Sequence, residues 1–569
     1  MGGIFRLPDQ VKFDYIPAMP SLPESLAPLA ILNTARRNAA EYYAPLLDSP
    51  NEVLRIGAWC ALIERGQVDY SQYPQLVAMA TNAGIRRRAY AYFVQFYEYD
   101  FAAQVAAIET SSDDAAEQAV MQAALGTDDD AHLAAVRASY LQSGKIETLF
   151  ELITLEEQIH GWRAALPLAV DLVVLNPHDP MATLELFYHL HMARQADLIE
   201  ALVALLDANG LHTHPAMLYS AAAKLLKGNP GGCLKTLGTL STARVARPDV
   251  AAKLRVVAMS LSGEALERMG DYRKAYAAYR EMNAFDHGKQ IALSEFGDMT
   301  LQSAALVVPP LPPDPRRHHY FVMTGFPRSG TTLLENAFAA HPAIETFEEI
   351  PSRSRMQYYI DRVLRASPPP DDLTAVYLEA RERYYGEIDR HRRKLAASTF
   401  IDKMPMRSAD AVFLVKVFPE TRYVFSIRHP FDVVLSCFKQ DFTPNVAMEH
   451  FRTFENAVKL YDFTMTQWFS VYSLNDPRVH YVRYDRLVTE FEPTVRGALD
   501  FLDVPWNDAV LGFAKAAETR STRTPSYQKV RQGLTIGVQT SWRNYGFLFQ
   551  SPAARPLYQW AEFFGHPKE

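Results

Sequence analysis

The stretch YFVMTGFPRSGTTLLENAFAA, residues 320–340, decides the fold of the C-terminal half of this 569-residue chain. It joins the apolar run YFVMT to a turn that holds Gly325 and Gly330, and then to the segment LLENAFAA. This order of features predicts a buried strand, a tight glycine loop and a helix. The free amide groups and the positive dipole end at the start of such a helix attract anions. We therefore predict that the loop binds a phosphate-like group.

The loop differs at one position from the loop that binds nucleoside triphosphates. That loop, G-x-x-x-x-G-K-[ST], uses its lysine to hold the β- and γ-phosphates and its hydroxyl to hold magnesium. Here Thr331 stands in the place of the lysine, Thr332 follows it, and Arg328 supplies a cation within the loop. Losing the lysine removes a clamp suited to a triphosphate and its metal, while arginine can hold an anion through two hydrogen bonds. We expect an anion of fewer charges, bound without a metal.

Other segments continue the same pattern along the C-terminal half. The short β-rich runs STFID, RYVFSI and VHYVRY begin at Ser398, Arg422 and Val479 and alternate with helical segments. This alternation indicates a parallel α/β sheet. The N-terminal half instead carries apolar residues at three- and four-residue spacing, which indicates amphipathic helices. We predict an α plus α/β chain, with a helical part first and a parallel, P-loop-like sheet after it.

A proline-rich segment, AALVVPPLPPDPRRHH, separates the two halves. Its prolines disfavour a helix and favour a stiff, extended connection. We therefore predict a helical domain over residues 1–302, a linker over residues 303–318 and an α/β domain over residues 319–569.

The helical half contains an irregular repeat. The steps from Ala165 to Ile199 and from Ile199 to Cys233 each span 34 residues, the length of a tetratricopeptide repeat. Cys233 then reads as a small packed residue and not as a reactive thiol. We predict a tetratricopeptide-like array, because stacked helix pairs of this kind form concave surfaces that bind partners. The clearest unit runs from Val256 to Met282 and places Gly263, Leu266, Gly270, Asp271, Tyr272, Ala275 and Tyr279 at the spacing of that repeat.

The overall composition restricts the possible partners and the compartment. A net charge of -7 argues against a general nucleic-acid binder, which would need a basic excess. The three cysteines, Cys60, Cys233 and Cys437, are too few and too far apart for a disulfide framework or a zinc cluster, which favours the reducing cytoplasm. The N-terminus has no cationic and then apolar pattern, and no run of about 18 apolar residues occurs. We expect no signal peptide and no membrane span.

Two motifs resemble one known family. GFPRSGTT resembles the 5'-phosphosulfate-binding loop of sulfotransferases that use 3'-phosphoadenosine 5'-phosphosulfate (PAPS). RYVFSIRHPFDVVLSCFKQDF resembles that family's 3'-phosphate-binding segment, in which a strand-end arginine and a helical serine eight residues later hold the phosphate; Arg428 and Ser436 take these positions. The resemblance implies PAPS as the donor and 3',5'-adenosine bisphosphate (PAP) as the product. The loop residues that it assigns to donor binding are Pro327, Arg328, Ser329, Gly330, Thr331 and Thr332.

Sulfuryl transfer to a hydroxyl needs a base, positive charge near the developing oxygens and in-line placement of the reactants. Among sulfotransferases, the chain is most similar to the tyrosylprotein sulfotransferases and their bacterial relatives that carry tetratricopeptide repeats. In that group a His-Pro pair and a Glu-Glu pair follow the loop helix, as His341-Pro342 and Glu348-Glu349 do here. The resemblance implies that Glu349 is the general base, with Glu348 as the alternative. His429 is a further alternative, since other sulfotransferase branches use histidine.

The same resemblance assigns roles to residues farther along the chain. IDKMP matches a K-x-P segment and nominates Lys403 to stabilise the bridging oxygen of the donor. In the C-terminal segment that closes over the nucleotide, Ser526 would touch the phosphosulfate and Trp542 marks a contact to the 3'-phosphate. Relatives place a cation directly before that tryptophan, whereas this chain has Ser541 there and Arg543 directly after it. Arg543 is therefore the candidate substitute.

Tyr484 corresponds to a tyrosine that lies near the adenine of the donor in the family.

The sequence defines the acceptor less closely than the donor. Arg353 and Arg355 would attract an acidic peptide. We predict transfer to a hydroxyl of a protein or peptide tyrosine, with a glycan or a small molecule as the alternative. A repeat-based interaction protein, whose sulfotransferase domain binds nucleotide without catalysis, is the alternative from another class. The residues nominated for catalysis are Glu349, Lys403, Arg328 and Ser526.

Overall fold

The structure is a computed structural model of the whole chain. It describes residues 43–108, 115–126, 128–176, 179–211, 213–240, 247–285, 291–365, 370–513 and 538–567. Contacts group these residues into two compact units. Unit 1 comprises the described residues up to Gly144 together with Ile350–His391, and unit 2 comprises Lys145–Glu349 together with the described residues from Arg392 onward. The predicted linker lies inside unit 2, and the predicted domain boundaries stay a prediction.

Unit 1 is a helical bundle built from two separate parts of the sequence. Its core holds buried aromatic side chains such as Trp59 and Phe93. The later part, which follows the strand that ends at Glu348, packs on the earlier part through polar contacts: Arg362 pairs with Glu98. Its helices are α3 (Glu52–Glu64), α4 (Tyr73–Met79), α5 (Ala83–Gln95), α6 (Tyr99–Ala106), α7 (Ala115–Leu125), α8 (Asp129–Ser143), α19 (Ser352–Leu364) and α20 (Leu373–Arg390).

Unit 2 begins with a series of helices, which confirms the helical part of the prediction. Cys233 is fully buried, as expected for a small packed residue. A side chain at Gly263 would lie 2.6 Å from the ring of Tyr279, so glycine is needed where α15 and α16 touch. The tetratricopeptide identity of the array stays a prediction. The helices are α9 (Ile146–His160), α10 (Trp162–Leu175), α11 (Pro180–Met192), α12 (Ala196–Ala208), α13 (His214–Leu226), α14 (Pro230–Leu237), α15 (Pro248–Arg268), α16 (Tyr272–Asn283) and α17 (Leu293–Ala305).

A charge cluster around the buried His189 joins α9 to α11. His189 lies with Nδ1 2.8 Å from Oε2 of Glu157 and Nε2 3.0 Å from Oε1 of Glu185. Burial alone would lower the pKa of His189, but the two carboxylates outweigh burial and raise this pKa to about 10. His189 is therefore positively charged at neutral pH and pairs with two partly exposed acidic side chains.

The C-terminal part of unit 2 is built on a five-stranded parallel sheet, which confirms the predicted class. The strands follow the order β2-β3-β1-β4-β5, and β1 pairs with β3 on one side and β4 on the other. The second strand in sequence, IETFE, was not predicted, because its charged residues hide the apolar pattern. The strands are β1 (Tyr320–Gly325), β2 (Ile344–Glu348), β3 (Thr399–Lys403), β4 (Arg422–Ile427) and β5 (Val479–Arg483).

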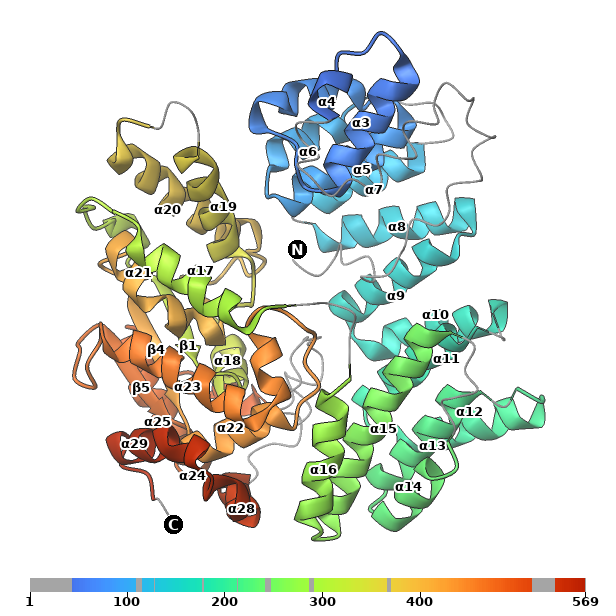
Figure 1. Cartoon of the computed structure of the whole chain (residues 1–569), viewed down its shortest axis with the longest axis vertical. Helices are drawn as coiled ribbons and strands as arrows, with labels where there is room; N and C mark the ends of the chain where they lie inside the picture. Colours follow the sequence, from blue (N-terminus) through green and yellow to red (C-terminus); the bar gives the residue numbers. More distant parts are fainter. Residues whose placement is uncertain are drawn as a thin grey trace. The chain divides into compact units, whose positions relative to one another are not determined.

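Helices cover both faces of the sheet, and alternate strand residues point to opposite faces. Phe321 and Met323 of β1 pack with helices α18 and α25, whereas Val322 packs on the face of α22 and α23. Figure 1 labels β1, β4 and β5 together with the helices around them. None of the helices in the described ranges is long and apolar enough to cross a membrane. The helices are α18 (Thr331–Ala340), α21 (Ala411–Val417), α22 (Pro430–Phe438), α23 (Phe454–Phe469), α24 (Tyr484–Thr489), α25 (Phe491–Phe501), α28 (Gly546–Phe549) and α29 (Arg555–Phe563).

Candidate active site

The carboxyl ends of the five strands bring most of the nominated residues to one edge of the sheet. Because all strands are parallel, the residues that follow them meet along this edge. The glycine loop follows β1 at Gly325, and the glutamate pair begins at Glu348, the last residue of β2. Lys403 ends β3, Arg428 follows β4, and Tyr484 follows β5. One edge therefore collects the loop, the candidate base and three further candidates.

The loop after β1 keeps a backbone shape that only glycine accepts at two positions. Gly325 has φ 154° and Gly330 has φ 106°. A Cβ at Gly325 would lie 2.7 Å from the carbonyl oxygen of Ser426, and a Cβ at Gly330 would lie 2.4 Å from Cδ2 of Tyr484. Between them Arg328 has φ 71°, a left-handed value that costs free energy for a residue with a side chain. Ser426 and Tyr484 thus lie against the two glycines, and the loop between the glycines has a strained backbone conformation.

The helix after the loop, α18, begins with backbone amides that no side chain caps. Gly330 is the N-cap of α18 and has no side chain that could accept hydrogen bonds from the first turn. Thr331 and Thr332 open the helix and are buried. The carbonyl oxygen of Pro327 accepts a contact from Sγ of Cys437 at 3.4 Å, which ties the loop to α22. Uncapped amides at a helix N-terminus suit an anion.

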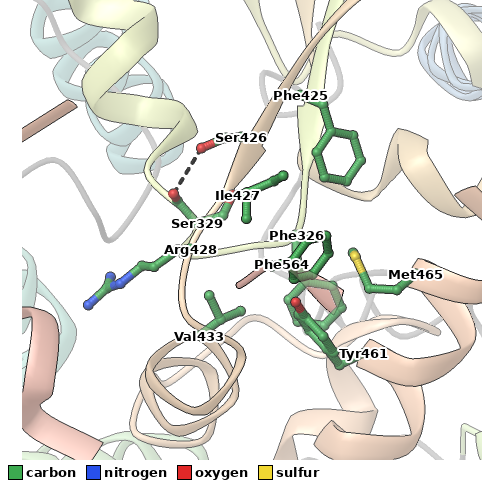
Figure 2. A pocket seen from close by; sticks show the side chains of 10 residues that line it. All are labelled: Phe326, Ser329, Phe425, Ser426, Ile427, Arg428, Val433, Tyr461, Met465 and Phe564. Carbon is green, nitrogen blue, oxygen red and sulfur yellow. Dashed lines mark hydrogen bonds between the residues drawn. The ribbon is translucent and has the colours of Figure 1, made fainter. Parts of the chain in front are cut away.

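Ser329 provides a test of whether a donor anion fits this loop. Its Oγ is buried and has no hydrogen-bond partner among the described residues, while its carbonyl oxygen accepts a hydrogen bond from Oγ of Ser426 at 2.9 Å. Figure 2 shows these two serines beside a small cavity, with the guanidinium of Arg428 directed away from the aromatic side chains. A buried hydroxyl without a partner fits a site for an oxyanion. The cavity is lined by Phe326, Ser329, Phe425, Ser426, Ile427, Arg428, Val433, Tyr461, Met465 and Phe564.

Arg328 and Arg428, the two arginines assigned to the donor's anionic groups in the two donor-binding motifs, contact each other in the structure. Nε of Arg328 donates to Oγ of Ser436 at 3.1 Å, and Nη1 of Arg428 donates to the carbonyl oxygen of Arg328 at 3.1 Å. The guanidinium of Arg428 also lies 4.6 Å from the ring centre of Tyr484. Burial and the nearby charge of Arg428 together lower the pKa of Arg328 to about 10, yet the group stays protonated at neutral pH. Four nominated residues thus form one cationic cluster beside the loop.

Lys403 is buried and lies at the centre of a cluster of three carboxylates. Its Nζ is 3.1 Å from Oε1 of Glu348, 3.1 Å from Oε1 of Glu349 and 3.4 Å from Oε2 of Glu335. Burial alone would lower the pKa of Lys403, but Glu335, Glu348 and Glu349 raise it above its ordinary value. Lys403 is 0% exposed, whereas the side chain of Glu349 is 40% exposed. The lysine is therefore a fixed cation, and Glu349 is the cluster's most accessible acid.

Two details of this cluster concern how Glu349 and Glu335 are placed. Glu349 has φ 52°, and its amide donates to the carbonyl oxygen of Lys403 at 2.8 Å, so its backbone is held where the strands end. Glu335 on α18 was not nominated from the sequence. It accepts a hydrogen bond from Oγ1 of Thr346 at 3.3 Å and is buried. A single acid in the apolar segment LLENAFAA was the signal that could have identified it.

The C-terminal segment reaches the same region through Asp432, which was also not nominated. Oγ of Ser541 and the amide of Trp542 donate to Oδ1 of Asp432 at 3.0 and 3.3 Å. Burial raises the pKa of Asp432 to about 6. Arg543 is exposed, with its guanidinium 5.5 Å from the ring centre of Trp542. Ser526, nominated to touch the phosphosulfate, lies outside the described residues.

The remaining nominated residues have other partners. Nδ1 of His429 accepts from the amide of Phe431 at 3.2 Å, and its Nε2 lies 2.7 Å from the carbonyl oxygen of Pro567. Both ring nitrogens are engaged, which makes His429 a poor base. Arg353 and Arg355 belong to α19 in unit 1. Nη1 of Arg355 lies 3.2 Å from Oε2 of the buried Glu387, and Nη1 of Arg353 donates to Oε1 of Gln357 at 2.7 Å.

Comparison with known proteins agrees with this arrangement. Residues 321–508 match the model of the sulfotransferase family. This part of the chain is similar to the sulfotransferase family. The matched residues include the loop, the glutamate pair, Lys403 and both residues of the 3'-phosphate motif. The family resemblance predicted from GFPRSGTT is thereby confirmed.

Curated relatives of the sulfotransferase domain include protein-tyrosine sulfotransferases. Protein-tyrosine sulfotransferase 1 of Danio rerio is 27% identical over 194 residues, which cover 33% of this chain and 54% of the relative. Protein-tyrosine sulfotransferase A of Caenorhabditis elegans is 27% identical over 219 residues, which cover 34% and 53%. An uncharacterized protein of Aquifex aeolicus is 26% identical over 247 residues, which cover 41% and 31%. The chain thus spans only 31% to 54% of the length of these relatives.

Solved structures of sulfotransferases also align with the chain. The sulfotransferase domain of the Synechococcus PCC 7002 olefin synthase aligns over 46% of this chain and 97% of its own, with 19% identity and a TM-score of 0.32. The sulfotransferase domain of the curacin biosynthetic pathway aligns over 46% and 99%, with 17% identity and a TM-score of 0.28.

Proposed function

We propose that the protein is a PAPS-dependent sulfotransferase that transfers the sulfuryl group to an acceptor hydroxyl. The observation that carries the proposal is the contact between Lys403 and Glu349 at 3.1 Å, at the same sheet edge as the glycine loop. A base and a fixed cation beside an anion-binding loop supply what sulfuryl transfer requires. A metal plays no part in the proposed reaction.

The loop and its neighbours would hold the donor at two anionic groups. The amides of α18, Arg328 and the side chains of Ser329, Thr331 and Thr332 would bind the phosphosulfate. Arg428 and Ser436 would bind the 3'-phosphate, and the ring of Tyr484 would lie against the adenine. The buried hydroxyl of Ser329 supports this assignment, because it lacks a partner among the described residues. In the C-terminal segment, Ser526, Trp542 and Arg543 stay candidates for closing over the nucleotide.

The chemistry would divide between Glu349 and Lys403. Glu349 would accept the proton of the acceptor hydroxyl as the new oxygen–sulfur bond forms. Lys403 would donate a hydrogen bond to the bridging oxygen of the leaving phosphate as the old sulfur–oxygen bond breaks. The raised pKa of Lys403 supports a fixed positive charge in this role, and the exposure of Glu349 supports access for an acceptor.

A protein or peptide tyrosine is our first choice of acceptor, because protein-tyrosine sulfotransferases are among the relatives. The helical array would then bind the acceptor protein, and Arg353 would attract acidic residues around the tyrosine. Arg355 is less suited to this role, since it already pairs with Glu387. We further propose a cytoplasmic location, since none of the three cysteines is in a disulfide.

Radiolabelled PAPS tests the proposal. The full chain would be incubated with the donor and either a panel of tyrosine peptides or a panel of glycans, with and without a chelator. Label in peptides, unaffected by the chelator, is the expected result. Label only in glycans would refute the tyrosine acceptor, and loss of activity with the chelator would refute the metal-free mechanism. Tight binding of PAP with no transfer to any acceptor would favour an interaction protein.

A further inference from the structure

Helices α15 and α16 of the helical array contact the α/β part of unit 2, and the carboxylate of Glu267 makes several of these contacts. Glu267 is in the last turn of α15, and α15 and α16 lie side by side as a hairpin (Figure 1). One oxygen of Glu267 contacts both Nζ of Lys439 and the hydroxyl of Tyr545, and the other accepts from the hydroxyl of Tyr279 at 3.1 Å. The carboxylate thus has partners in three segments.

Two of these partners lie one helical turn beyond residues of the proposed 3'-phosphate site. Lys439 is three residues after Ser436, and Tyr545 is three residues after Trp542. Residues three apart on a helix lie on the same face, so Glu267 contacts each segment one turn away from its residue of the proposed 3'-phosphate site. At that site, Ser436 accepts a hydrogen bond from Arg328.

The contact has the features of a built junction. Tyr545 and Tyr279 are buried, and Nζ of Lys439 lies 5.5 and 5.6 Å from the centres of their rings. Gly263 leaves the space in which the ring of Tyr279 reaches α15. Glu267 and Lys439 are about one fifth exposed, and charged hydrogen bonds in such a partly buried setting are stronger than neutral ones and fix geometry.

A second set of bonds keeps the same hairpin against α22. Nδ2 of Asn283 donates to the carbonyl oxygen of Phe438 at 2.7 Å, and Nε of Arg452 donates to the carbonyl oxygen of Asn283 at 2.7 Å. The ring of Tyr276 lies 5.2 Å from that of Phe438. The end of α22 therefore cannot shift without breaking contacts with α16.

We propose that Glu267 is a positioning residue for the donor's 3'-phosphate. It sets the distance between α22, which carries Ser436, and the segment that carries Trp542. The hairpin that the sequence identifies as the clearest repeat unit thus completes the donor site instead of serving only to bind acceptors. This inference rests on the proposed function, because it assumes that Arg428 and Ser436 bind the 3'-phosphate.

Calorimetry with two nucleotides tests the inference. PAP carries the 3'-phosphate and adenosine 5'-monophosphate lacks it, so the ratio of their Kd values isolates recognition of that group. For Glu267→Gln we expect PAP binding to weaken about tenfold, with adenosine 5'-monophosphate binding within about twofold of wild type. If the substitution instead disrupted the fold, the binding of both nucleotides would weaken together and the ratio of their Kd values would stay the same. Tyr545→Phe removes a single hydroxyl and should move the same ratio in the same direction by a smaller factor.

Glu281→Gln is the matched control, because Glu281 lies on the same hairpin and forms a half-exposed pair with Arg255 at 2.7 Å. It should leave the ratio unchanged. An unchanged ratio in both Glu267→Gln and Tyr545→Phe would overturn the inference while leaving the proposed function intact. If Glu267→Gln does not fold, Tyr545→Phe decides alone. A wild-type protein that does not prefer PAP over adenosine 5'-monophosphate would overturn the proposed function, and the inference with it.

Discussion

Lys403 and Glu349 contact each other twice: Nζ of the lysine lies 3.1 Å from Oε1 of the glutamate, and the glutamate amide donates to the lysine carbonyl oxygen at 2.8 Å. The side-chain contact brings base and cation together, and the backbone contact joins the ends of β2 and β3. Glu349 must lose its contact with Lys403 before it can accept a proton. The bridging oxygen of a bound donor would attract the ammonium group of Lys403 and so release Glu349. Donor binding would therefore prepare Glu349 for its role.

Replacing Glu349 by Gln removes the proposed base and keeps its shape. We expect turnover to fall on the order of a hundredfold or more, since that is what loss of a general base costs. PAP affinity should stay within about twofold of wild type, since the proposed nucleotide contacts are untouched. Turnover would be measured with radiolabelled PAPS, and Glu348→Gln is the control. If Glu349→Gln kept turnover within a few-fold of wild type while Glu348→Gln lost it, the base would be Glu348.

Arg328→Ala should weaken PAP binding by at least about tenfold, because hydrogen bonds from a charged group are lost in a buried setting. Ser436→Ala should have a smaller effect in the same direction, since a neutral hydroxyl contributes less. Calorimetry gives both values. Arg496→Ala is the control, because Arg496 pairs with Glu492 in an exposed position on α25. Unchanged PAP affinity in Arg328→Ala would contradict the assignment of the loop.

Gly330→Ala should lower the free energy of unfolding by roughly 2 kcal/mol and weaken PAP binding, because a left-handed backbone and a ring contact both oppose a Cβ. The added atom would lie 2.4 Å from Cδ2 of Tyr484. Gly297→Ala is the matched control: Gly297 lies within α17, and a Cβ there would meet nothing within 4 Å. That variant should be slightly more stable than wild type. Urea denaturation would compare the two, and equal effects would contradict the role of Gly330.

The positive charge of His189 should make the free energy of unfolding depend on pH. Its pKa is raised to about 10 in the folded chain from an ordinary value of 6.5. A raised pKa means that the stabilisation is fully present below pH 6.5 and is lost as the pH rises toward 10. Between pH 7 and 9 the stability advantage of wild type over His189→Gln should fall by roughly 1.4 kcal/mol per pH unit. Urea denaturation across this range would measure it; a constant difference would show that His189 is neutral.

Much of the site could be predicted because it follows strand ends. A parallel sheet collects the residues after its strands, so the motifs around Arg328, Lys403 and Arg428 could be placed together from sequence alone. Asp432 could not, because its role depends on partners from another element, and Glu335 left only one signal, a single acid in an apolar helical segment. β2 was missed because Glu345 and Glu348 interrupt its apolar pattern.

The grouping of α19 and α20 with the first helices lay beyond sequence reasoning for a different reason. The contact between Arg362 and Glu98 joins residues that are 264 positions apart. Neither residue belongs to a motif, and charged residues at these positions read equally well as solvated surface. Only the packing of the folded chain makes them partners.

That grouping has a consequence for how the chain can be divided. Glu349 is the last residue of a segment of unit 2, and Ile350 is the first residue of the returning segment of unit 1. One peptide bond therefore separates the proposed base from the helical bundle. A fragment that starts at residue 319 would retain Glu387 but lose Tyr99, whose hydroxyl donates to it at 3.2 Å. A fragment made to study catalysis should therefore keep the helices of unit 1 that precede Gly144, although they lie far from Glu349 in the sequence.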